Sequence, residues 1–254
     1  MFRVVIPARY ASTRLPGKVL LPIAGRPMLQ WVYDSASAAG ADEVLIATDD
    51  ARIVQAANGF GAQAVMTDST HRSGTDRIAE VARVRDWAAQ EVVVNVQGDE
   101  PLMPAALIGQ VASLLSAQPQ ADIATLATPI DSVAELLDPN VVKVVTDARG
   151  MALYFSRAPI PWNRDAAGGT LASEAGVGGA LRHRGIYAYR VAPLLHLARL
   201  PPGVLEEREK LEQLRALEHG LRIHVARACA RPGPDVNTPA DLERVAALVA
   251  REGS

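Results

Sequence analysis

Short apolar runs alternate with amphipathic segments along the first half of the chain. Each run is typical of a buried strand, and we predict strands over 4–6, 44–48, 62–66 and 92–96. Apolar residues at helical spacing predict helices between these strands, over 28–39, 51–58 and 74–87. This alternation predicts an α/β fold in which a mostly parallel central sheet carries helices on both faces.

The pattern becomes mixed beyond Pro104. Apolar and β-branched runs predict further strands over 123–130, 141–147, 186–190 and 222–227. Helices are predicted over 206–219 and 238–251, the second with Thr238 as N-cap and Pro239 at its first position. The segment 168–180 is rich in Gly and Ala and is predicted to be a loop. Because no linker interrupts the chain, we expect one domain over residues 1–254.

The loop after the first strand carries three cations, Arg9, Arg14 and Lys18. Pro7 is expected to end the strand, because it has no N–H to donate. The loop should then project from the carboxyl end of the strand, where α/β sheets place their ligands. Three cations there favour a polyanion such as a triphosphate over a solvated basic turn.

Two common phosphate loops are excluded at this position. A Walker loop needs a glycine where Ser12 stands and a hydroxyl residue where Val19 follows Lys18. No G-x-G-x-x-G follows the first strand, so a dinucleotide-binding motif of the usual kind is not expected.

Gln97-Gly98-Asp99 follows the run 92–96, which is apolar apart from Asn95. A carboxylate just past a buried parallel strand lies at the edge of the sheet that binds ligands, and Mg²⁺ prefers one or two carboxylates together with phosphate oxygens. Gly-Asp is also common turn chemistry, so Asp99 alone is equally well explained as a turn residue. Together with the cationic loop, the metal-binding interpretation is favoured.

Composition narrows the classes of function. The chain has 254 residues, 49% of them hydrophobic, and a formal net charge of −2, whereas a general nucleic-acid-binding domain would be strongly basic. Cys229 is the only cysteine, which excludes an internal disulfide and fits a reducing, cytoplasmic location. We expect no signal peptide and no membrane association, because the first apolar stretch is short and no segment approaches about 20 apolar residues.

Several motifs, in order along nearly the whole chain, resemble those of the sugar nucleotidyltransferases. The loop ends in Leu-Pro-Gly-Lys at 15–18, and further blocks lie at 71–77, 94–101, 154–162, 182–190, 210–215 and 236–242. Within that group the chain most resembles the family of 3-deoxy-manno-octulosonate (Kdo) cytidylyltransferases. The resemblance implies a Rossmann-like nucleotide-diphospho-sugar transferase fold, with a small antiparallel dimerisation elaboration over about 122–155.

The resemblance also implies an activity. An enzyme of this family joins CTP and Kdo, giving CMP-Kdo and diphosphate, for lipopolysaccharide biosynthesis. We therefore expect CTP and Kdo as substrates, Mg²⁺ as cofactor, a homodimer as the assembly and no nucleic-acid partner. No strong general base is required, because the anomeric hydroxyl of Kdo is comparatively acidic and a metal ion would favour its ionisation.

The same resemblance assigns roles to individual residues. The catalytic set is Arg9, Lys18 and Asp99. The CTP contacts are Ala8, Arg9, Ser12, Lys18, Arg72, Ser73 and Gln97, and the Kdo contacts are Arg157, His183, Tyr187, Glu212 and Gln213. From the residues themselves, Ser73 is predicted to cap the next helix, and Asp76 and Arg77 to form a pair on its surface. Without the resemblance, the charged residues around Glu212 and Gln213 predict that both lie on a solvent-exposed helix face.

The chain departs from the family at Asn237, where the family motif has an aspartate that binds the metal. An asparagine still offers a carbonyl oxygen but no charge, so metal affinity should fall. Asp235 faces the same side in an extended segment and is a candidate to replace part of the lost carboxylate; the alternative is that Asn237 serves together with water. The predicted metal ligands are therefore Asp99, Asn237 and Asp235.

The motifs leave two other functions open and exclude a third. A cytidylyltransferase acting on another acidic sugar, such as amino-Kdo or a sialic-acid-like acceptor, fits the same motifs. A catalytically silent nucleotide-sugar-binding protein has only Asn237 in its favour. A nucleic-acid-binding module is rejected, because the basic excess and the stacking aromatics are both missing.

Overall fold

The computed structural model describes residues 1–11, 15–164 and 177–252. Ser12, Arg14 and most of the predicted loop 168–180 lie outside the described residues. The last part of that loop, 177–180, forms a turn closed by a hydrogen bond from the Ala180 N–H to the Val177 carbonyl at 3.0 Å. No helix in the described ranges is long and apolar enough to cross a membrane.

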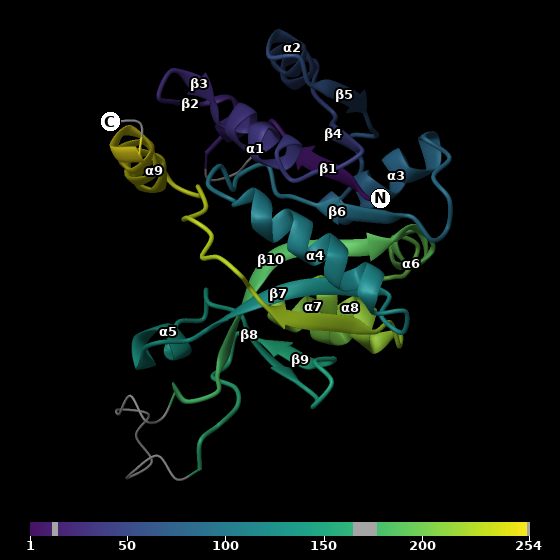
Figure 1. The fold of residues 1–254 in the computed structure, drawn as a ribbon, viewed down its shortest axis with the longest axis vertical. Helices are drawn as coiled ribbons and strands as arrows, with labels where there is room; N and C mark the ends of the chain where they lie inside the picture. Colours follow the sequence, from purple (N-terminus) through teal and green to yellow (C-terminus); the bar gives the residue numbers. More distant parts are fainter. Residues whose placement is uncertain (12–14, 165–176, 253–254) are drawn as a thin grey trace.

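A mixed, mostly parallel sheet forms the centre of the molecule (Figure 1). Its strands run in the order β11 (Ile223–Arg227), β7 (Ile123–Pro129), β10 (Leu181–Arg190), β6 (Val92–Asn95), β1 (Arg3–Ala8), β4 (Glu43–Thr48) and β5 (Gln63–Met66). Only β10 runs antiparallel to its neighbours in this order. The predicted fold class is confirmed, and the carboxyl ends of β1, β4, β5 and β6 share one edge.

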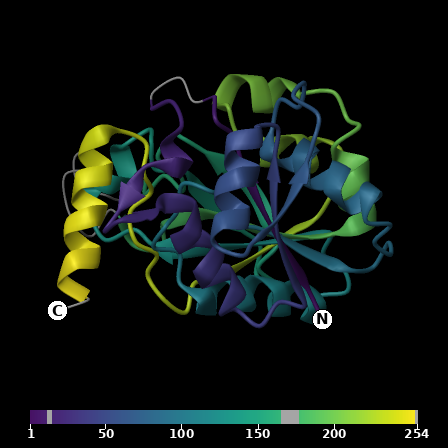
Figure 2. The same ribbon diagram turned by 90° about the horizontal axis from the view of Figure 1, so that it is seen from above.

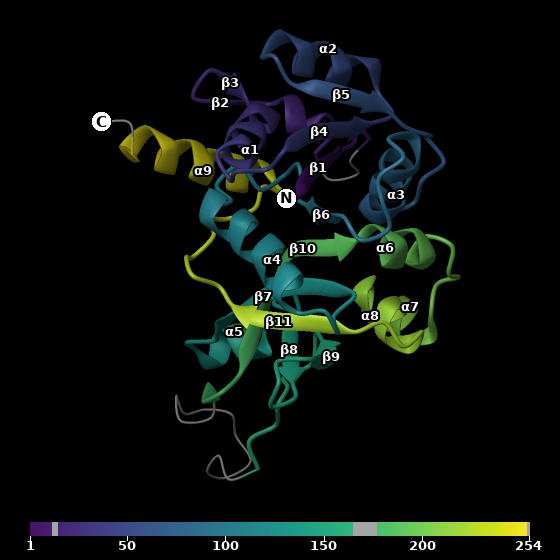
Figure 3. The ribbon, with the colours of Figure 1, turned by 45° about the vertical axis from the view of Figure 1, so that its right-hand side comes forward.

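Helices cover both faces because alternate strand residues point to opposite sides. Val4 and Ile6 of β1 join one core, and Val5 joins the other. The first core is covered by α1 (Met28–Ser37), α2 (Ala51–Gly59) and α4 (Ala105–Ala117). The second is covered by α3 (Gly74–Val84), α6 (Val191–Leu197) and α8 (Gln213–Glu218), which Figure 3 shows together on the other side of the sheet.

The C-terminal helix α9 (Pro239–Glu252) lies apart from these two layers (Figure 2). It packs on the small hairpin of β2 (Pro22–Ile23) and β3 (Arg26–Pro27) and on the start of α1. Val245 and Val249 of α9 share this third apolar cluster with Ile23 and Met28. The hairpin follows the predicted triphosphate loop, so α9 anchors the end of the chain beside that loop.

Pro7 does not end its strand, contrary to the prediction. β1 continues to Ala8 and pairs with β4, with Pro7 opposite Ala47. The Val5 carbonyl accepts from the Val96 N–H on the β6 side, and Pro7, two residues on, faces the same side. The ladder with β6 has ended at Val5, so the N–H that proline lacks is not needed there.

The helix predicted over 206–219 is two helices. α7 (Val204–Glu209) stops at Lys210, which adopts a left-handed conformation with φ 54°, and α8 starts at Gln213. The break turns the second helix toward the sheet, and Leu211 and Leu214 are buried in the core. Glu212 and Gln213 therefore lie on the inner side of the break and not on a solvated helix face.

The predicted elaboration at 122–155 is only partly separate from the sheet. β7 is an inner strand of the central sheet. β8 (Lys143–Thr146) and β9 (Ala152–Ser156) form an antiparallel pair that extends one end of β10. Helix α5 (Val133–Leu137) lies on the same part of the molecule in Figures 1 and 3. A role of the region 122–155 in a dimer stays a prediction.

Candidate active site

The loop after β1 is closed at its base by its own backbone. The Gly17 N–H donates to the Tyr10 carbonyl at 2.8 Å. Gly17 has φ 67°, and an added Cβ would lie 3.0 Å from the Tyr10 ring, so both the backbone angle and the space favour glycine. A short 3₁₀ turn, Lys18–Leu20, follows and fixes where the Lys18 side chain starts.

Lys18 joins three segments that are distant in the sequence. Its ammonium lies 2.5 Å from the Asp99 carboxylate and donates to the Val236 carbonyl at 3.1 Å. The same nitrogen lies 3.4 Å from Oδ1 of Asn237. The Val236 N–H in turn donates to the Asp99 carbonyl at 2.9 Å. The structure thus brings Lys18, Asp99 and Asn237 to one point, as the motifs predict.

Asn237 is held by the cap of α9. Its N–H donates to the Asp241 carboxylate at 3.1 Å, while the Asp241 N–H donates to the Thr238 hydroxyl at 3.2 Å. The predicted N-cap at Thr238 is thereby confirmed. The side-chain amide of Asn237 donates to the Asp235 carboxylate, so these two side chains do face the same side.

The oxygen atoms around Lys18 suit a hard cation. Asp99 and Asn237 both place an oxygen toward its ammonium, and Asp235 adjoins Asn237. One or two carboxylates with an amide oxygen match the ligands that Mg²⁺ takes beside a phosphate. Within the described ranges no three His, Cys, Asp or Glu side chains gather into a metal site. The set therefore fits an ion shared with a phosphate better than one held by protein alone.

Arg9 follows β1 at the same edge. Burial lowers the pKa of its guanidinium, and Arg77 lowers it further, while Asp49, Asp76 and Glu212 act in the opposite direction. Its Nη2 atom is buried with no hydrogen-bond partner among the residues that the structure describes. A buried guanidinium with an unused donor is suited to a phosphate oxygen.

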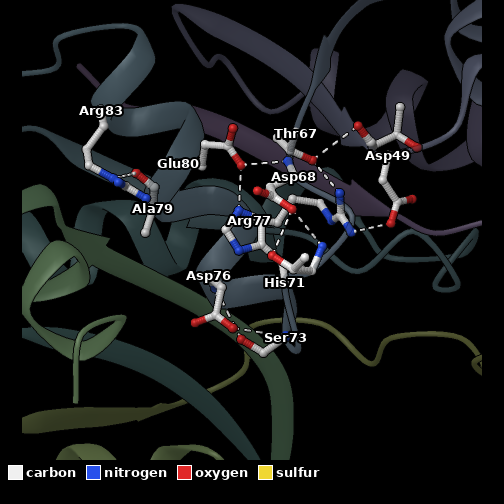
Figure 4. A network of polar contacts seen from close by, with 12 residues as sticks. Asp49, Thr67, Asp68, His71, Ser73, Asp76, Arg77, Ala79, Glu80 and Arg83 are labelled. Atoms are coloured by element: carbon white, nitrogen blue, oxygen red, sulfur yellow. Dashed lines mark hydrogen bonds and ion pairs between the residues drawn. The ribbon is translucent and has the colours of Figure 1, made fainter. Parts of the chain in front are cut away.

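Asp76 and Arg77 do not form the predicted surface pair. Asp76 completes a capping box with Ser73, which confirms Ser73 as the N-cap of α3. The Arg77 side chain is fully buried and lies 2.8 Å from the Asp49 carboxylate (Figure 4). The prediction failed because the order of charges in the sequence does not show that Asp49, distant in the sequence, supplies a partner for Arg77 inside the protein.

The start of α3 approaches the end of β1 closely. A Cβ on Gly74 would lie 3.2 Å from the Pro7 ring, and one on Gly98 would lie 3.0 Å from the Pro7 carbonyl. These contacts place Ser73 and Gln97, the residues before the two glycines, near the end of β1. Arg72 and Ser73 also line an open pocket of about 390 Å³ with Glu206, Lys210, Glu212 and Arg215.

A small inner pocket of about 40 Å³ holds most of the predicted Kdo contacts. Gln97, Tyr187, Glu212 and Gln213 line it, together with Thr75, Asn95, Ile123, Tyr189 and Leu197. The Thr75 hydroxyl donates to Glu212 at 2.6 Å, and burial raises the pKa of that carboxyl. Burial also raises the pKa of Tyr187, so its phenol keeps its proton as a hydrogen-bond donor.

His183 is buried next to Tyr187 and is not among the residues that line this pocket. Its ring lies 5.3 Å from the Tyr187 ring, and its Nε2 atom is 3.0 Å from the Thr125 hydroxyl. Burial, with the nearby Arg184, lowers the pKa of His183 to about 3. The imidazole is therefore neutral near neutral pH, so it can hydrogen-bond a substrate but cannot supply a positive charge.

Arg157 is directed elsewhere in this structure. Its guanidinium donates to the Glu209 carbonyl at 2.7 Å and to the Pro139 carbonyl at 2.8 Å. The lining of the inner pocket, taken over the described residues, contains no arginine. Arg157 therefore does not line the inner pocket in this structure.

Glu100 is a site residue that sequence reasoning missed. Its Oε2 atom is buried without a partner in the described part of the chain. Burial, with Asp99 and Asp235 nearby, raises its pKa to about 8. Glu100 lines a cavity of about 480 Å³ with Arg182, His183, Arg184, Asp235 and Arg244 among others. Its place in Gly-Asp-Glu-Pro, directly after Asp99, was the available signal.

Comparison with known proteins agrees with this arrangement. Residues 3–223 match the model of the cytidylyltransferase family. The chain is 54% identical to a 3-deoxy-manno-octulosonate cytidylyltransferase of Thioalkalivibrio sulfidiphilus and 56% identical to one of Pseudomonas syringae pv. syringae, with 98% of each chain covered in both cases.

Solved structures give the same result. A CMP:2-keto-3-deoxy-manno-octonic acid synthetase complexed with CTP superimposes with a TM-score of 0.89 at 44% identity, covering 99% of this chain and 100% of the other. A nucleotidyl transferase of Methanothermobacter, with a TM-score of 0.63 at 17% identity, shares the fold. The chain belongs to the 3-deoxy-manno-octulosonate cytidylyltransferase family of the cytidylyltransferases.

Proposed function

We propose that this protein transfers a cytidylyl group from CTP to Kdo, forming CMP-Kdo and diphosphate. The observation that carries the proposal is the meeting of Lys18, Asp99 and Asn237 at the carboxyl edge of the sheet, next to Arg9. This is the arrangement that a triphosphate and a divalent cation need, and it stands in a chain that aligns over 98% of its length with relatives of that name.

In this reaction an oxygen of Kdo attacks the α-phosphorus, and the bond from that phosphorus to the β-phosphate oxygen breaks. Diphosphate leaves with the bonding electron pair, and the hydroxyl proton is lost to solvent. Arg9 and Lys18 bind the triphosphate and stabilise the charge that moves onto the leaving group. Gln97 and Ser73 hold the nucleotide against the end of β1, which aligns the α-phosphorus.

The inner pocket, at about 40 Å³, is much smaller than an octulosonate, so it receives only part of the acceptor. Tyr187 donates a hydrogen bond, the Glu212 carboxyl accepts one, and Gln213 does either, which suits the hydroxyls of a sugar. Arg157 is the proposed partner of the acceptor carboxylate, and binding would require it to exchange its present carbonyl partners for that carboxylate. Neutral His183 contributes hydrogen bonding and holds the Tyr187 ring in place.

Mg²⁺ is the proposed cofactor, held by Asp99 and by the carbonyl oxygen of Asn237, with Asp235 beside them. When bound, the ion neutralises phosphate charge and polarises the reacting oxygens. Lys18 now pairs with Asp99 and orients its carboxylate. Asn237 supplies an oxygen without a charge, so we expect weaker metal binding than an aspartate would give.

The cellular setting is also proposed. The enzyme would work in the cytoplasm and supply CMP-Kdo for lipopolysaccharide biosynthesis. A homodimer is proposed through the β8–β9 part of the chain, where large apolar side chains are exposed. Leu153 is 63% exposed, Trp162 58% and Leu137 50%, and an interface would cover such residues.

The test is release of diphosphate from CTP, Kdo and Mg²⁺, run beside UTP, ATP and a sialic acid. Release with CTP and Kdo alone is the expected result. Release with another acidic sugar would keep the mechanism and change the acceptor. Measurable CTP binding with no release for any acceptor would refute the proposed activity in favour of a binding protein.

A further inference from the structure

Arg77 is a buried cation that the reaction does not use directly. Its side chain has 0% exposure, and its two terminal nitrogens donate to the Thr67 hydroxyl and, at 2.8 Å, to Asp49 (Figure 4). A buried charge is costly unless it is paired and hydrogen-bonded. Such a side chain at the edge of the candidate active site therefore needs an explanation.

The strand register shows what Arg77 joins. Ala8 of β1 is paired with Thr48 of β4, and Thr48 is paired with Met66 of β5. The residues that follow Ala8, Thr48 and Met66 are Arg9, Asp49 and Thr67, in that order. Three neighbouring strands thus end in a phosphate-binding cation, a carboxylate and a hydroxyl, and Arg77 reaches the second and third of them from α3.

Asp49 interacts with two guanidinium groups. It pairs directly with Arg77, and its charge also acts on Arg9, where it opposes the repulsion from Arg77. Without the carboxylate, Arg77 would repel Arg9 at the point where the triphosphate must bind. The Thr67 hydroxyl on the other side of Arg77 donates to the Thr48 carbonyl at 3.1 Å and carries no charge.

We propose that Asp49 and Arg77 are positioning residues for Arg9, holding its guanidinium where it meets the triphosphate of CTP. The inference rests on the proposed function and extends it to a buried ion pair outside the substrate contacts. Because Arg77 belongs to the helix that Ser73 caps, the pair also links the nucleotide-binding start of α3 to the triphosphate-binding end of β1.

The direction in which CTP affinity changes in the Asp49→Asn variant distinguishes a positioning role from a purely electrostatic one. Asp49→Asn removes a negative charge near a site for a polyanion, so through-space electrostatics alone would tighten CTP binding. Loss of positioning instead leaves Arg77 unbalanced and displaces Arg9, which weakens CTP binding. The two explanations therefore predict opposite changes in the same measurement.

The experiment is titration calorimetry of CTP, with Mg²⁺ and without Kdo, on the full chain. We expect Asp49→Asn to weaken CTP binding about tenfold, the scale of coupling between groups in contact. Asp49→Glu should recover part of the loss. Thr67→Val is the matched control, because it removes the other partner of Arg77 and should lower the thermal stability with CTP affinity within about twofold of wild type.

A second comparison tests whether Asp49 acts through Arg9. In an Arg9→Ala background, Asp49→Asn should change CTP affinity by less than about twofold, because the group it positions is gone. An equal loss in both backgrounds, tighter binding by Asp49→Asn, or the same loss in Thr67→Val would each overturn the inference. If Asp49→Asn does not fold, Asp49→Glu decides: wild-type CTP affinity in a variant whose carboxylate is displaced would also overturn it.

Failure of the proposed function has a different signature. Wild type that binds CTP but releases no diphosphate would refute the activity while the binding comparisons still decide the inference. Wild type that binds no CTP would overturn both.

Discussion

Asn237→Asp should make the stability of this protein depend more strongly on magnesium. The Asn237 amide now donates to the Asp235 carboxylate, and the substitution replaces that donor with a second negative charge. Losing the hydrogen bond costs about 1 kcal/mol. The new carboxylate is repelled by Asp235 and Asp99 and attracted by Lys18, which leaves about one uncompensated repulsion, ~1 kcal/mol in a largely solvated setting.

The sum is about 2 kcal/mol, which lowers the melting temperature of a chain of this size by about 5 °C in a chelating buffer. With Mg²⁺ and CTP the sign should reverse, because the added carboxylate then faces a divalent cation. The assay is thermal unfolding of both proteins in the two buffers, and the magnesium-dependent shift should be larger in the variant than in wild type.

Asn140→Asp is a matched control. The Asn140 amide donates to Asp138 at 3.0 Å, with the same two-residue spacing and far from the site in the sequence. The melting temperature of the Asn140→Asp variant should fall by the same amount in both buffers. If Asn237→Asp behaved in the same way as this control, the segment 235–237 would not face a metal, and the argument for Asn237 as a ligand would be refuted.

Three further predictions concern the same edge of the sheet. Lys18→Met should lower kcat for diphosphate release by about a hundredfold or more, since it removes a charged donor from the triphosphate; a fall below tenfold would contradict that role. Gly98→Ala should destabilise the fold by about 1–3 kcal/mol, because its Cβ would lie 3.0 Å from the Pro7 carbonyl. Gly109→Ala, whose Cβ meets only an ordinary 3.5 Å contact inside α4, is its control in denaturant titrations and should be neutral or stabilising. Glu100 has a folded-state pKa of about 8 against an ordinary 4.5, so it binds its proton more tightly when folded, and its contribution to the free energy of unfolding falls as pH rises between those values. Glu100→Gln should therefore lose less stability than wild type from pH 5 to pH 9 in metal-free buffer, and parallel curves would contradict the raised pKa.

The sequence predicted the features that depend on chain order and local caps. Strands alternating with helices require a parallel sheet, and residues that follow such strands must meet at its carboxyl edge, which placed Lys18 and Asp99. Ser73 and Thr238 were predicted as N-caps because a capping side chain acts within three residues of its own position. The β10 strand was predicted only in its second half. Its first half is rich in arginine and histidine rather than in apolar residues, and it pairs with β7 and, at Leu181 and Arg182, with β8.

The failures at Pro7 and Lys210 are of a different kind, because each was decided by a contact distant in the sequence. Pro7 stays in β1 since β6 has already ended beside it. The helix predicted over 206–219 breaks at Lys210, and the burial of Leu211 and Leu214 offsets the left-handed conformation there. The helix α4 was not predicted, because it is apolar on most of its surface and lacks a clear periodic pattern.

Arg77 shows why a charge pattern alone misjudges this site. Seen in sequence, Asp76 and Arg77 are neighbours of opposite sign, and a solvated pair is the ordinary expectation. In the structure the two charges separate: Asp76 binds the start of its own helix, and Arg77 turns inward to Asp49, 28 residues away. Burying a guanidinium gains little stability by itself. Its retention beside Arg9 is better explained by the geometry it imposes on a cation that must bind a triphosphate, and the CTP-binding comparison of Asp49→Asn with Thr67→Val measures that difference.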